Sequence, residues 1–324
     1  DMNFTDLFLM RHELMLVLLA AIILVSELLF DEKGSSPKIR FLASSLFFIN
    51  LIVGFLPAET GEMFGGMYRT SDMHILIKNI LNIGVFIIFL QSDRWLANEE
   101  NSFKTAEFFI IMISTLTGMF FMISAGDFLM FYIGLELATI PLAALAAYEV
   151  YKNKSAEAGI KLILSSALSS GVLLWGISMI YGTTGSVYFE EVKASFAISG
   201  LSILGFIFFM SGMGFKISLV PFHLWTADVY EGSPIGVTSY LSVISKGAAL
   251  TILTIILFTV FPAIIEMWQN VIYIIAIITM TVGNLFAIRQ NNIKRFLAFS
   301  SISQAGYILL GIIGGNQFRT EERR

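Results

Sequence analysis

The sequence predicts an all-α polytopic membrane protein with about ten transmembrane helices. Of its 324 residues, 56% are hydrophobic and 14% are charged, whereas soluble domains carry about 25% charged residues. The mean hydropathy is +0.80. A membrane β-barrel would show alternating strands of about ten residues, but runs such as LMLVLLAAIILVSELLF are continuously apolar. Helices are therefore the expected spanning elements.

Ten apolar segments have the length of a spanning helix, which is about 20 residues. We expect spans at residues 13–30, 41–56, 75–91, 107–124, 128–148, 159–181, 200–220, 235–260, 268–288 and 293–314. Polar loops such as DEKGSSPKIR mark their edges. We expect the first segment to be a permanent span and not a signal peptide, because it has 18 residues, contains Glu13 and Glu27 and lacks a small-residue cleavage site.

Composition excludes several classes of function. A net charge of −4 and the lack of a long basic run argue against a nucleic-acid partner. The absence of cysteine excludes thiolate-held iron–sulfur clusters, disulfides and catalytic thiols. The three histidines do not supply a buried bis-histidine haem site. We therefore expect no metal and no cofactor in this chain, and the lipid bilayer as its surroundings.

Basic residues in the loops predict the orientation, because cytoplasmic loops are enriched in them. Three lie on one side, namely Arg11, Arg69 and Lys193. Ten lie on the other, namely Lys33, Lys38, Arg40, Arg94, Lys104, Lys152, Lys154, Arg289, Lys294 and Arg295. This places the N-terminus outside. The tail NQFRTEERR puts three further basic residues outside, and together with the missing initiator methionine it suggests an incomplete chain.

Charges inside the predicted spans are the main functional signal. Lys216, Lys246 and Glu136 lie deep in their spans, where a charge costs on the order of 2.5–3.5 kcal/mol on insertion scales. Lys78 and Lys161 lie nearer the ends, where snorkelling to the surface is the favoured interpretation. The structural alternative for the deep charges is a set of buried ion pairs that only fix helix packing.

Two of the charged spans share one sequence pattern, in which a proline follows the charged residue by five positions. Pro221 follows Lys216, and Pro141 follows Glu136. Each proline removes a helical hydrogen bond to the carbonyl four residues earlier. Because irregular backbone at membrane depth survives only beside a cavity or inside protein, we expect hydrated breaks in both helices.

These residues suggest a proton relay. Burial lowers a lysine pKa and a nearby carboxylate raises it, so Glu136 could switch Lys216, with Lys246 receiving the proton. His223 is either a proton shuttle or a cap for backbone groups at the break. Several serines either hold water or bond their own helices, namely Ser165, Ser166, Ser169, Ser170, Ser242 and Ser245. The stretch SSISQAGY, 300–307, either lines a second path or packs helices closely.

The stretches GLELATIPL, GFKISLVPFHLWTADVYEGSP, SVISKGA and IKRFLAFSSISQAGY resemble the antiporter-like membrane subunits of respiratory complex I, the proton-pumping NADH:quinone oxidoreductase. The motifs extend from about residue 130 to 310. The resemblance implies an antiporter-like fold with inverted repeats and broken helices. Glu136, Lys216 and Lys246 match the family's glutamate and two lysines. Ala227 and Ser233 depart from the family's usual proline and alanine.

The resemblance also implies a division of the chain. Residues 1–100 would form an N-terminal three-helix region, residues 101–262 the first five-helix proton-channel repeat, and residues 263–324 the start of a second repeat. The family's outward-side lysine on the twelfth helix would lie beyond the end of this sequence. The second repeat is therefore expected to be incomplete.

The expected function is proton translocation in the bacterial inner membrane, as a non-redox subunit of a translocase. NADH, FMN, iron–sulfur clusters and quinone would be bound by other subunits, and the partners would be neighbouring membrane-arm subunits. One alternative is a subunit of a multisubunit sodium/proton antiporter. A second is a structural membrane subunit with inert ion pairs.

Overall fold

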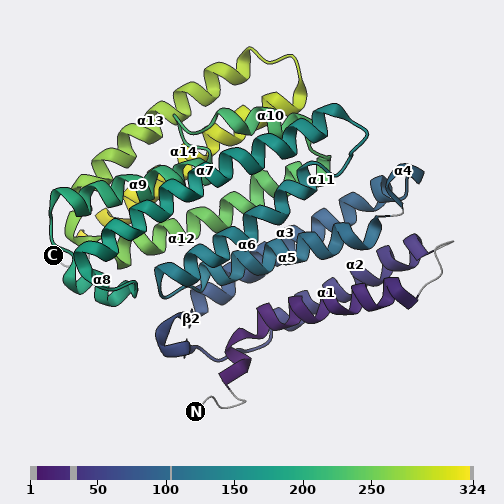
Figure 1. The fold of residues 1–324 in the computed structure, drawn as a ribbon, viewed down its shortest axis with the longest axis horizontal. Coiled ribbons are helices and arrows are strands. Elements are labelled where there is room, and N and C mark those ends of the chain that lie inside the picture. The colour runs from purple at the N-terminus through teal and green to yellow at the C-terminus, as the bar shows by residue number, and fades with distance from the viewer. Residues whose placement is uncertain (1–5, 30–34, 103, 322–324) are drawn as a thin grey trace. The chain divides into compact units, whose positions relative to one another are not determined.

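A computed structural model describes residues 6–29, 35–102 and 104–321 (Figure 1). Within them, ten helices are long and apolar enough to cross a membrane, which confirms the predicted number of spans. They cover Leu7–Leu29, Ser36–Gly54, Asp72–Leu96, Thr105–Ile123, Phe128–Ala146, Asn153–Thr184, Gly200–Ile217, Ile235–Thr259, Pro262–Ile288 and Ile293–Gly314. Lys33 and residues 322–324, which entered the prediction of orientation, lie outside the described residues.

The chain divides into two compact units. The first contains residues 1–156 and 233–248, and the second contains residues 157–232 and 249–324. Two helices, α7 (Asn153–Thr184) and α12 (Lys246–Thr259), begin in the first unit and continue into the second.

The first unit is built from helices and one short hairpin (Figure 1). Its elements are η1 (Asp6–Met10), α1 (Arg11–Leu29), α2 (Ser35–Gly54), β1 (Gly61–Met63), η2 (Phe64–Gly66), β2 (Tyr68–Thr70), α3 (Asp72–Leu96), α4 (Glu99–Ser102), α5 (Thr105–Ile123), α6 (Phe128–Ala146), α11 (Ile235–Ser239) and the π-helix η3 (Tyr240–Ser245).

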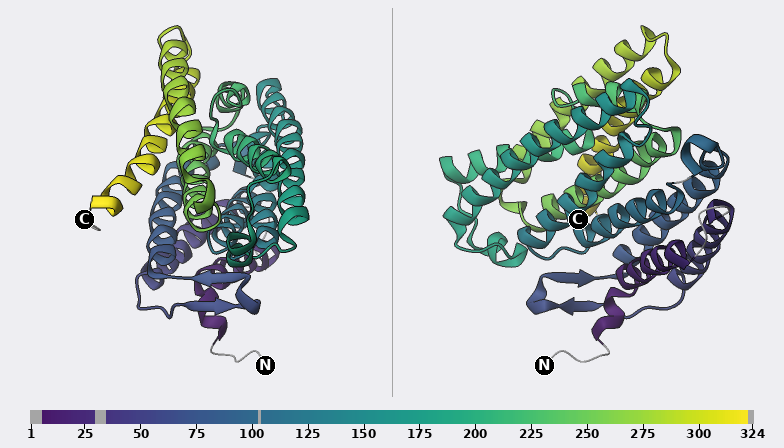
Figure 2. Two further views of the ribbon diagram at one scale, coloured as in Figure 1. Left: turned by 90° about the vertical axis from the view of Figure 1, so that its left-hand side faces the viewer. Right: turned by 45° about the vertical axis from the view of Figure 1, so that its right-hand side comes forward.

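The hairpin β1–β2 is antiparallel, with Glu62 paired to Arg69, and Figure 2 shows both strands beside η1. The end of α2 near this hairpin is capped by a side chain from α1. The Arg11 guanidinium donates hydrogen bonds of 2.9 to 3.1 Å to the carbonyls of Gly54, Leu56 and Pro57. Gly54 is the last residue of α2, so its carbonyl has no intrahelical donor, and Leu56 and Pro57 follow the helix end. Arg11 therefore holds the entry to the hairpin.

Glycines bring α5 and α6 into backbone contact. A β-carbon at Gly118 would lie 2.5 Å from the backbone nitrogen of Ala138, and one at Gly134 would lie 2.5 Å from that of Met122. Small residues of this kind let membrane helices approach closely. The Asp127 carboxylate caps α6 by accepting a bond from the backbone N–H of Met130 at 2.7 Å. The position of α6, which carries Glu136, is thereby fixed.

The second unit consists of helices that pack along their lengths. Its elements are α7, α8 (Phe189–Ser195), α9 (Gly200–Ile217), α10 (Leu224–Gly232), α12, η4 (Pro262–Ile264), α13 (Ile265–Ile288) and α14 (Ile293–Glu321). Helices α13 and α14 meet at small residues, since a β-carbon at Gly283 would lie 2.8 Å from the backbone nitrogen of Ser303. A β-carbon at Gly306 would lie 3.1 Å from the Ala276 carbonyl. Close helix packing is thus the interpretation of SSISQAGY that the structure supports.

One predicted break is present and the other is wrong. The helix that carries Lys216 ends at Ile217, and α10 begins only at Leu224. The helix that carries Glu136 runs through Pro141 to Ala146 without interruption. A membrane helix tolerates an internal proline when the freed groups are satisfied locally. Proline alone therefore does not identify a break.

A β-carbon at Gly118 would collide with backbone and not with a movable side chain, and overpacking of this kind costs about 1–3 kcal/mol. We predict that Gly118→Ala lowers the thermal unfolding midpoint of the detergent-solubilised protein by several degrees. Gly182→Ala in α7 is the matched control, because a β-carbon there meets nothing within 4 Å. Equal midpoints for the two variants would contradict the packing described.

Candidate functional site

The buried end of α9 carries Lys216. A reciprocal capping box between Ser199 and Ser202 starts this helix, and Ser218 ends it with left-handed backbone (φ 68°, ψ 40°). Lys216 is the second-last helical residue, and 8% of it is exposed. The structure thus places Lys216 where the helix stops, at the break that was expected before Pro221.

The break after α9 is closed by hydrogen bonds from protein groups. The backbone N–H groups of Ser218 and Leu219 donate to the carbonyls of Phe215 and Gly214, at 3.0 and 2.8 Å. The Trp225 indole Nε1 of α10 also donates to the Phe215 carbonyl at 3.1 Å, and its ring stacks on the Phe215 ring at 5.2 Å.

A further bond joins the break to α13, where the Val220 N–H donates to Thr279 Oγ1 at 3.1 Å. The backbone on both sides of the break is thus tied to α10 and to α13. The position of Lys216 therefore depends on these two helices.

His223 lies in the break itself. It is 7% exposed, and its Nδ1 has no hydrogen-bond partner within the described part of the chain. An imidazole nitrogen that is buried without a partner costs free energy unless water or another group bonds it. A role as proton shuttle and a role as backbone cap both stay predictions.

Lys246 follows a π-helix directly. Its side chain is buried, with 4% of the residue exposed, and η3 provides the six residues before it. The Tyr240 hydroxyl of η3 is hydrogen-bonded to Thr115 Oγ1 of α5 at 2.7 Å. A β-carbon at Gly84 of α3 would lie 2.5 Å from Ile244 Cδ1. The wider π turn is therefore packed against two helices, and such turns are frequent at functional sites.

Glu136 is half-buried on α6, one turn before Pro141. Its Oε1 is buried and has no hydrogen-bond partner among the residues that the structure describes. Glu136 and Lys246 belong to the first unit, while Lys216 and His223 belong to the second. The pairing of Glu136 with Lys216 and the order of the relay stay predictions.

The serines near these residues bond backbone carbonyls. The Ser165, Ser166 and Ser242 hydroxyls donate to the carbonyls of Lys161, Ile163 and Ser239 in or next to their own helices. The Ser169 hydroxyl donates across to the Gly212 carbonyl of α9 at 3.2 Å. For these four serines the structure shows the backbone bonds that were one of the two alternatives, and a role in holding water stays a prediction.

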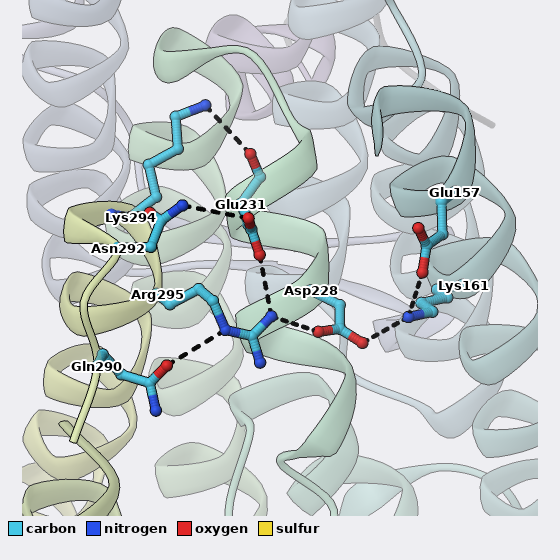
Figure 3. Close-up of polar contacts among 8 residues, drawn as sticks. All are labelled: Glu157, Lys161, Asp228, Glu231, Gln290, Asn292, Lys294 and Arg295. Atoms are coloured by element: carbon cyan, nitrogen blue, oxygen red, sulfur yellow. Dashed lines mark hydrogen bonds and ion pairs between the residues drawn. The ribbon is translucent and has the colours of Figure 1, made fainter. Parts of the chain in front are cut away.

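A network of alternating charges ties α10 to α7 and α14, and the sequence reasoning missed most of it (Figure 3). The Lys161 ammonium of α7 lies 2.6 Å from Glu157 Oε1 and 2.5 Å from Asp228 Oδ2. Arg295 Nη1 of α14 lies 2.6 Å from Asp228 Oδ1 and 3.0 Å from Glu231 Oε2.

Polar groups surround this network on the side of α14. Asn292 Nδ2 donates to Glu231 Oε1 at 3.1 Å, and Arg295 Nε donates to Gln290 Oε1 at 3.3 Å. Burial would raise the pKa of the Asp228 carboxyl, but the hydrogen bonds from Lys161 and Arg295 lower that pKa by more, so it lies below its ordinary value. Asp228 is therefore held ionised between two cations. Lys161 was expected to snorkel, and it remains 40% exposed while its ammonium is paired.

The snorkelling predicted for Lys78 is wrong. Its side chain is 1% exposed, and its ammonium lies 2.6 Å from Glu13 Oε1. The Tyr68 hydroxyl of β2 accepts from Lys78 at 3.1 Å and donates to Glu13 Oε2 at 2.9 Å. A partner 65 residues away in the sequence keeps the lysine inside. The signal for this pair was present, since Glu13 and Lys78 are both near the same predicted side.

No cluster of three or more His, Cys, Asp or Glu suited to a metal ion occurs in the described ranges 6–29, 35–102 and 104–321. The chemistry that these groups offer is movement or storage of protons. Lysine, glutamate, histidine and the charge network all supply titratable groups.

The sequence is similar to those of known proteins. The family model described as NADH:quinone oxidoreductase/Mrp antiporter, TM matches residues 125–321. NADH-quinone oxidoreductase subunit N of Phocaeicola vulgatus is 54% identical over 277 residues, which cover 86% of this chain and 58% of that protein. Subunit N of Azobacteroides pseudotrichonymphae is 50% identical over 316 residues, with 97% and 66% covered. The chain thus spans about three fifths to two thirds of the length of these relatives.

Solved structures share the fold. A chain of respiratory complex I from Thermus thermophilus with bound aureothin superposes with a TM-score of 0.75 at 26% identity, covering 94% of this chain and 65% of that one. A chain of the membrane-bound sulfane sulfur reductase, an archaeal respiratory membrane complex, also gives 0.75, at 21% identity, with 94% and 64% covered. The antiporter-like all-α fold predicted from the sequence is confirmed.

The Glu13–Lys78 pair is buried, so removing one partner leaves the other charge uncompensated, at a cost of about 3–5 kcal/mol. We predict that Lys78→Met lowers the thermal unfolding midpoint strongly. The double variant Glu13→Leu with Lys78→Met should recover much of the loss, because it leaves no unpaired charge. A double variant as unstable as the sum of the two single variants would show that the pair is not coupled.

The charge network predicts a local effect at α10. Partly exposed ion pairs contribute about 0.2–1 kcal/mol each, and Asp228→Asn weakens two of them and leaves two cations facing each other. We expect faster hydrogen–deuterium exchange in residues 224–232, with little change elsewhere. Glu157→Gln is the control, because it removes only the more exposed end of the network. Unchanged exchange in Asp228→Asn would mean that the network does not hold α10.

Proposed function

The chain belongs to the NADH:quinone oxidoreductase/Mrp antiporter transmembrane family, and from this premise we propose that it is a proton-translocating membrane-arm subunit of an NADH:quinone oxidoreductase. The observation that carries the proposal is the burial of Lys216 at the end of a broken helix in a membrane protein. Ionisable residues inside a membrane are costly and mark ion pathways by default.

Each relay residue has a distinct role in this proposal. Glu136 stabilises the charged form of Lys216 when it is near and releases the proton when it withdraws. Lys246, after the π-helix, receives the proton and passes it towards the second repeat. His223 exchanges protons between the break and water. The support is the burial of Lys216, Lys246 and His223 and the unpartnered Oε1 of Glu136 within the described residues.

The redox chemistry belongs to other subunits. The sequence contains no cysteine, so it cannot ligate an iron–sulfur cluster through thiolates. NADH, FMN, clusters and quinone are bound elsewhere in the complex, and quinone reduction is sensed here through charges and helix shifts. The Asp228 network suits such sensing, because it joins α7, α10 and α14 through charges (Figure 3).

The proposal also covers the division of the chain, its membrane and orientation, and its partners. Residues 1–100 form the N-terminal three-helix region, 101–262 the first proton-channel repeat, and 263–324 the start of the second. The chain lies in the bacterial inner membrane with its N-terminus outside, which the distribution of basic loop residues supports. Its partners are the neighbouring antiporter-like and small membrane subunits of the complex.

The sodium/proton antiporter alternative rests on the family description, which includes Mrp antiporters. Relatives at 54% and 50% identity carry the name NADH-quinone oxidoreductase subunit N, which favours the first proposal. The structural alternative requires that the buried charges be inert.

The test measures proton pumping by membrane vesicles that contain the full-length protein in its complex. Positioned proton-transfer groups contribute roughly 10²-fold or more, so we predict that Lys246→Met and Glu136→Gln each reduce NADH-driven pumping at least about tenfold while the complex stays assembled. Lys154→Met, at an exposed position, should leave pumping unchanged. Normal pumping in both relay variants would favour the structural alternative, and a requirement for sodium would favour the antiporter.

A further inference from the structure

Two buried asparagines in the first unit have amide atoms without partners. Asn50 of α2 is 3% exposed and Asn82 of α3 is 1% exposed. Nδ2 of Asn50 and both Nδ2 and Oδ1 of Asn82 lack a hydrogen-bond partner within the described residues. Buried polar groups are almost always bonded, either to protein groups or to ordered water.

The packing of α2 against α3 brings these two amides to one level. A β-carbon at Gly54 would lie 2.4 Å from Asn79 Oδ1, and the rings of Phe47 and Phe89 are 4.7 Å apart. Asn50 is between Phe47 and Gly54 on α2, at helical spacings that share one face. Asn82 is between Asn79 and Phe89 on α3, again on one face. The two asparagines therefore both lie between these two contacts, on the helix faces that carry them.

One turn away, the fold satisfies the same chemical group completely. Asn79 Oδ1 is bonded to His12 Nε2 at 3.1 Å, and Asn79 Nδ2 donates to the Gly54 carbonyl at 2.9 Å. Side chains and backbone supply both partners there. At Asn50 and Asn82 the described residues supply no partner for Asn50 Nδ2 or for either amide atom of Asn82.

We propose that Asn50 and Asn82 bind a buried water molecule between α2 and α3. The three atoms are two N–H donors and one carbonyl acceptor. A water oxygen accepts from both donors, and one of its hydrogens is donated to Oδ1, which makes the three bonds typical of buried water. A cation would face two N–H groups and an anion would face the carbonyl oxygen. Water fits both the two donors and the acceptor, because it can accept and donate hydrogen bonds.

This water extends the polar core of the N-terminal helices beyond the Lys78 ion pair. Asn82 lies one helical turn after Lys78 on α3, so the water adds a dipole one turn from the buried pair. On the other side, Phe47, Phe89 and Phe109 form a layer with ring centroids 4.7 Å apart in each successive pair. Because Phe47 and Phe89 continue the faces of α2 and α3 that carry the two asparagines, the proposed water lies next to an aromatic layer, and it solvates the core without opening a path for protons.

The first experiment is radiolytic hydroxyl labelling of the full-length protein in its complex, which reports ordered water beside buried rings. Phe47 and Phe89 are fully buried, and so is the control Phe131 of α6. We expect labelling of Phe47 and Phe89 to exceed that of Phe131 several-fold. Asn50→Leu with Asn82→Leu should reduce it to the level of Phe131 and leave proton pumping unchanged. Labelling of Phe47 and Phe89 no greater than that of Phe131 in the unaltered protein would overturn the proposal.

A second measurement needs no variant. A density map that resolves water should show a peak within hydrogen-bond distance of both carboxamides. A direct hydrogen bond between Asn50 and Asn82, with no peak between them, would overturn the proposal. A collapse of pumping in the variant with Asn50→Leu and Asn82→Leu would contradict a water site that is separate from the proton path. It would not bear on the relay proposed above.

Discussion

A helix break at membrane depth is tolerated only where its backbone is buried in protein or lines a water-filled cavity, and protein groups bond the backbone of the break between α9 and α10. The backbone of Ser218 and Leu219, the Trp225 indole and Thr279 provide the bonds described here. This arrangement makes it possible to end a helix at a buried lysine. The rest of the site depends on it, because α10 and α13 are held in place by the same contacts.

Buried charges in this chain fall into two kinds. Lys78 and Glu13 are bonded to each other and to Tyr68, so their charges are fixed and suit a packing role. Glu136 has a carboxylate oxygen without a partner within the described residues, and Lys216 and Lys246 lie at a helix end and after a π-helix. In the proposed relay the two lysines lie beside irregular backbone and Glu136 has the unpartnered oxygen, whereas Lys78 and Glu13 are bonded to each other.

Hydropathy was sufficient to predict the ten spans, because the bilayer requires long apolar helices whatever their neighbours. Local chemistry was less informative. The same spacing of charge and proline gave a break at Pro221 and a continuous helix at Pro141, since tertiary contacts decide which proline is tolerated. The partners of Lys78 and of Arg295 lie 65 and 67 residues away. No spacing along one helix predicts such pairs, and for Glu13 and Lys78 the sequence indicated only that both lie near the same predicted side. The π-helix before Lys246 likewise has no signature in its sequence.

The measurement that tests the central claim most directly is proton pumping by vesicles that carry Lys216→Ala in the full-length protein, with the rate of NADH-driven quinone reduction recorded beside it. If Lys216 is an obligatory relay coupled to the redox step, both rates collapse while the complex remains assembled. Unchanged pumping would contradict the account and would make the buried lysine a packing device.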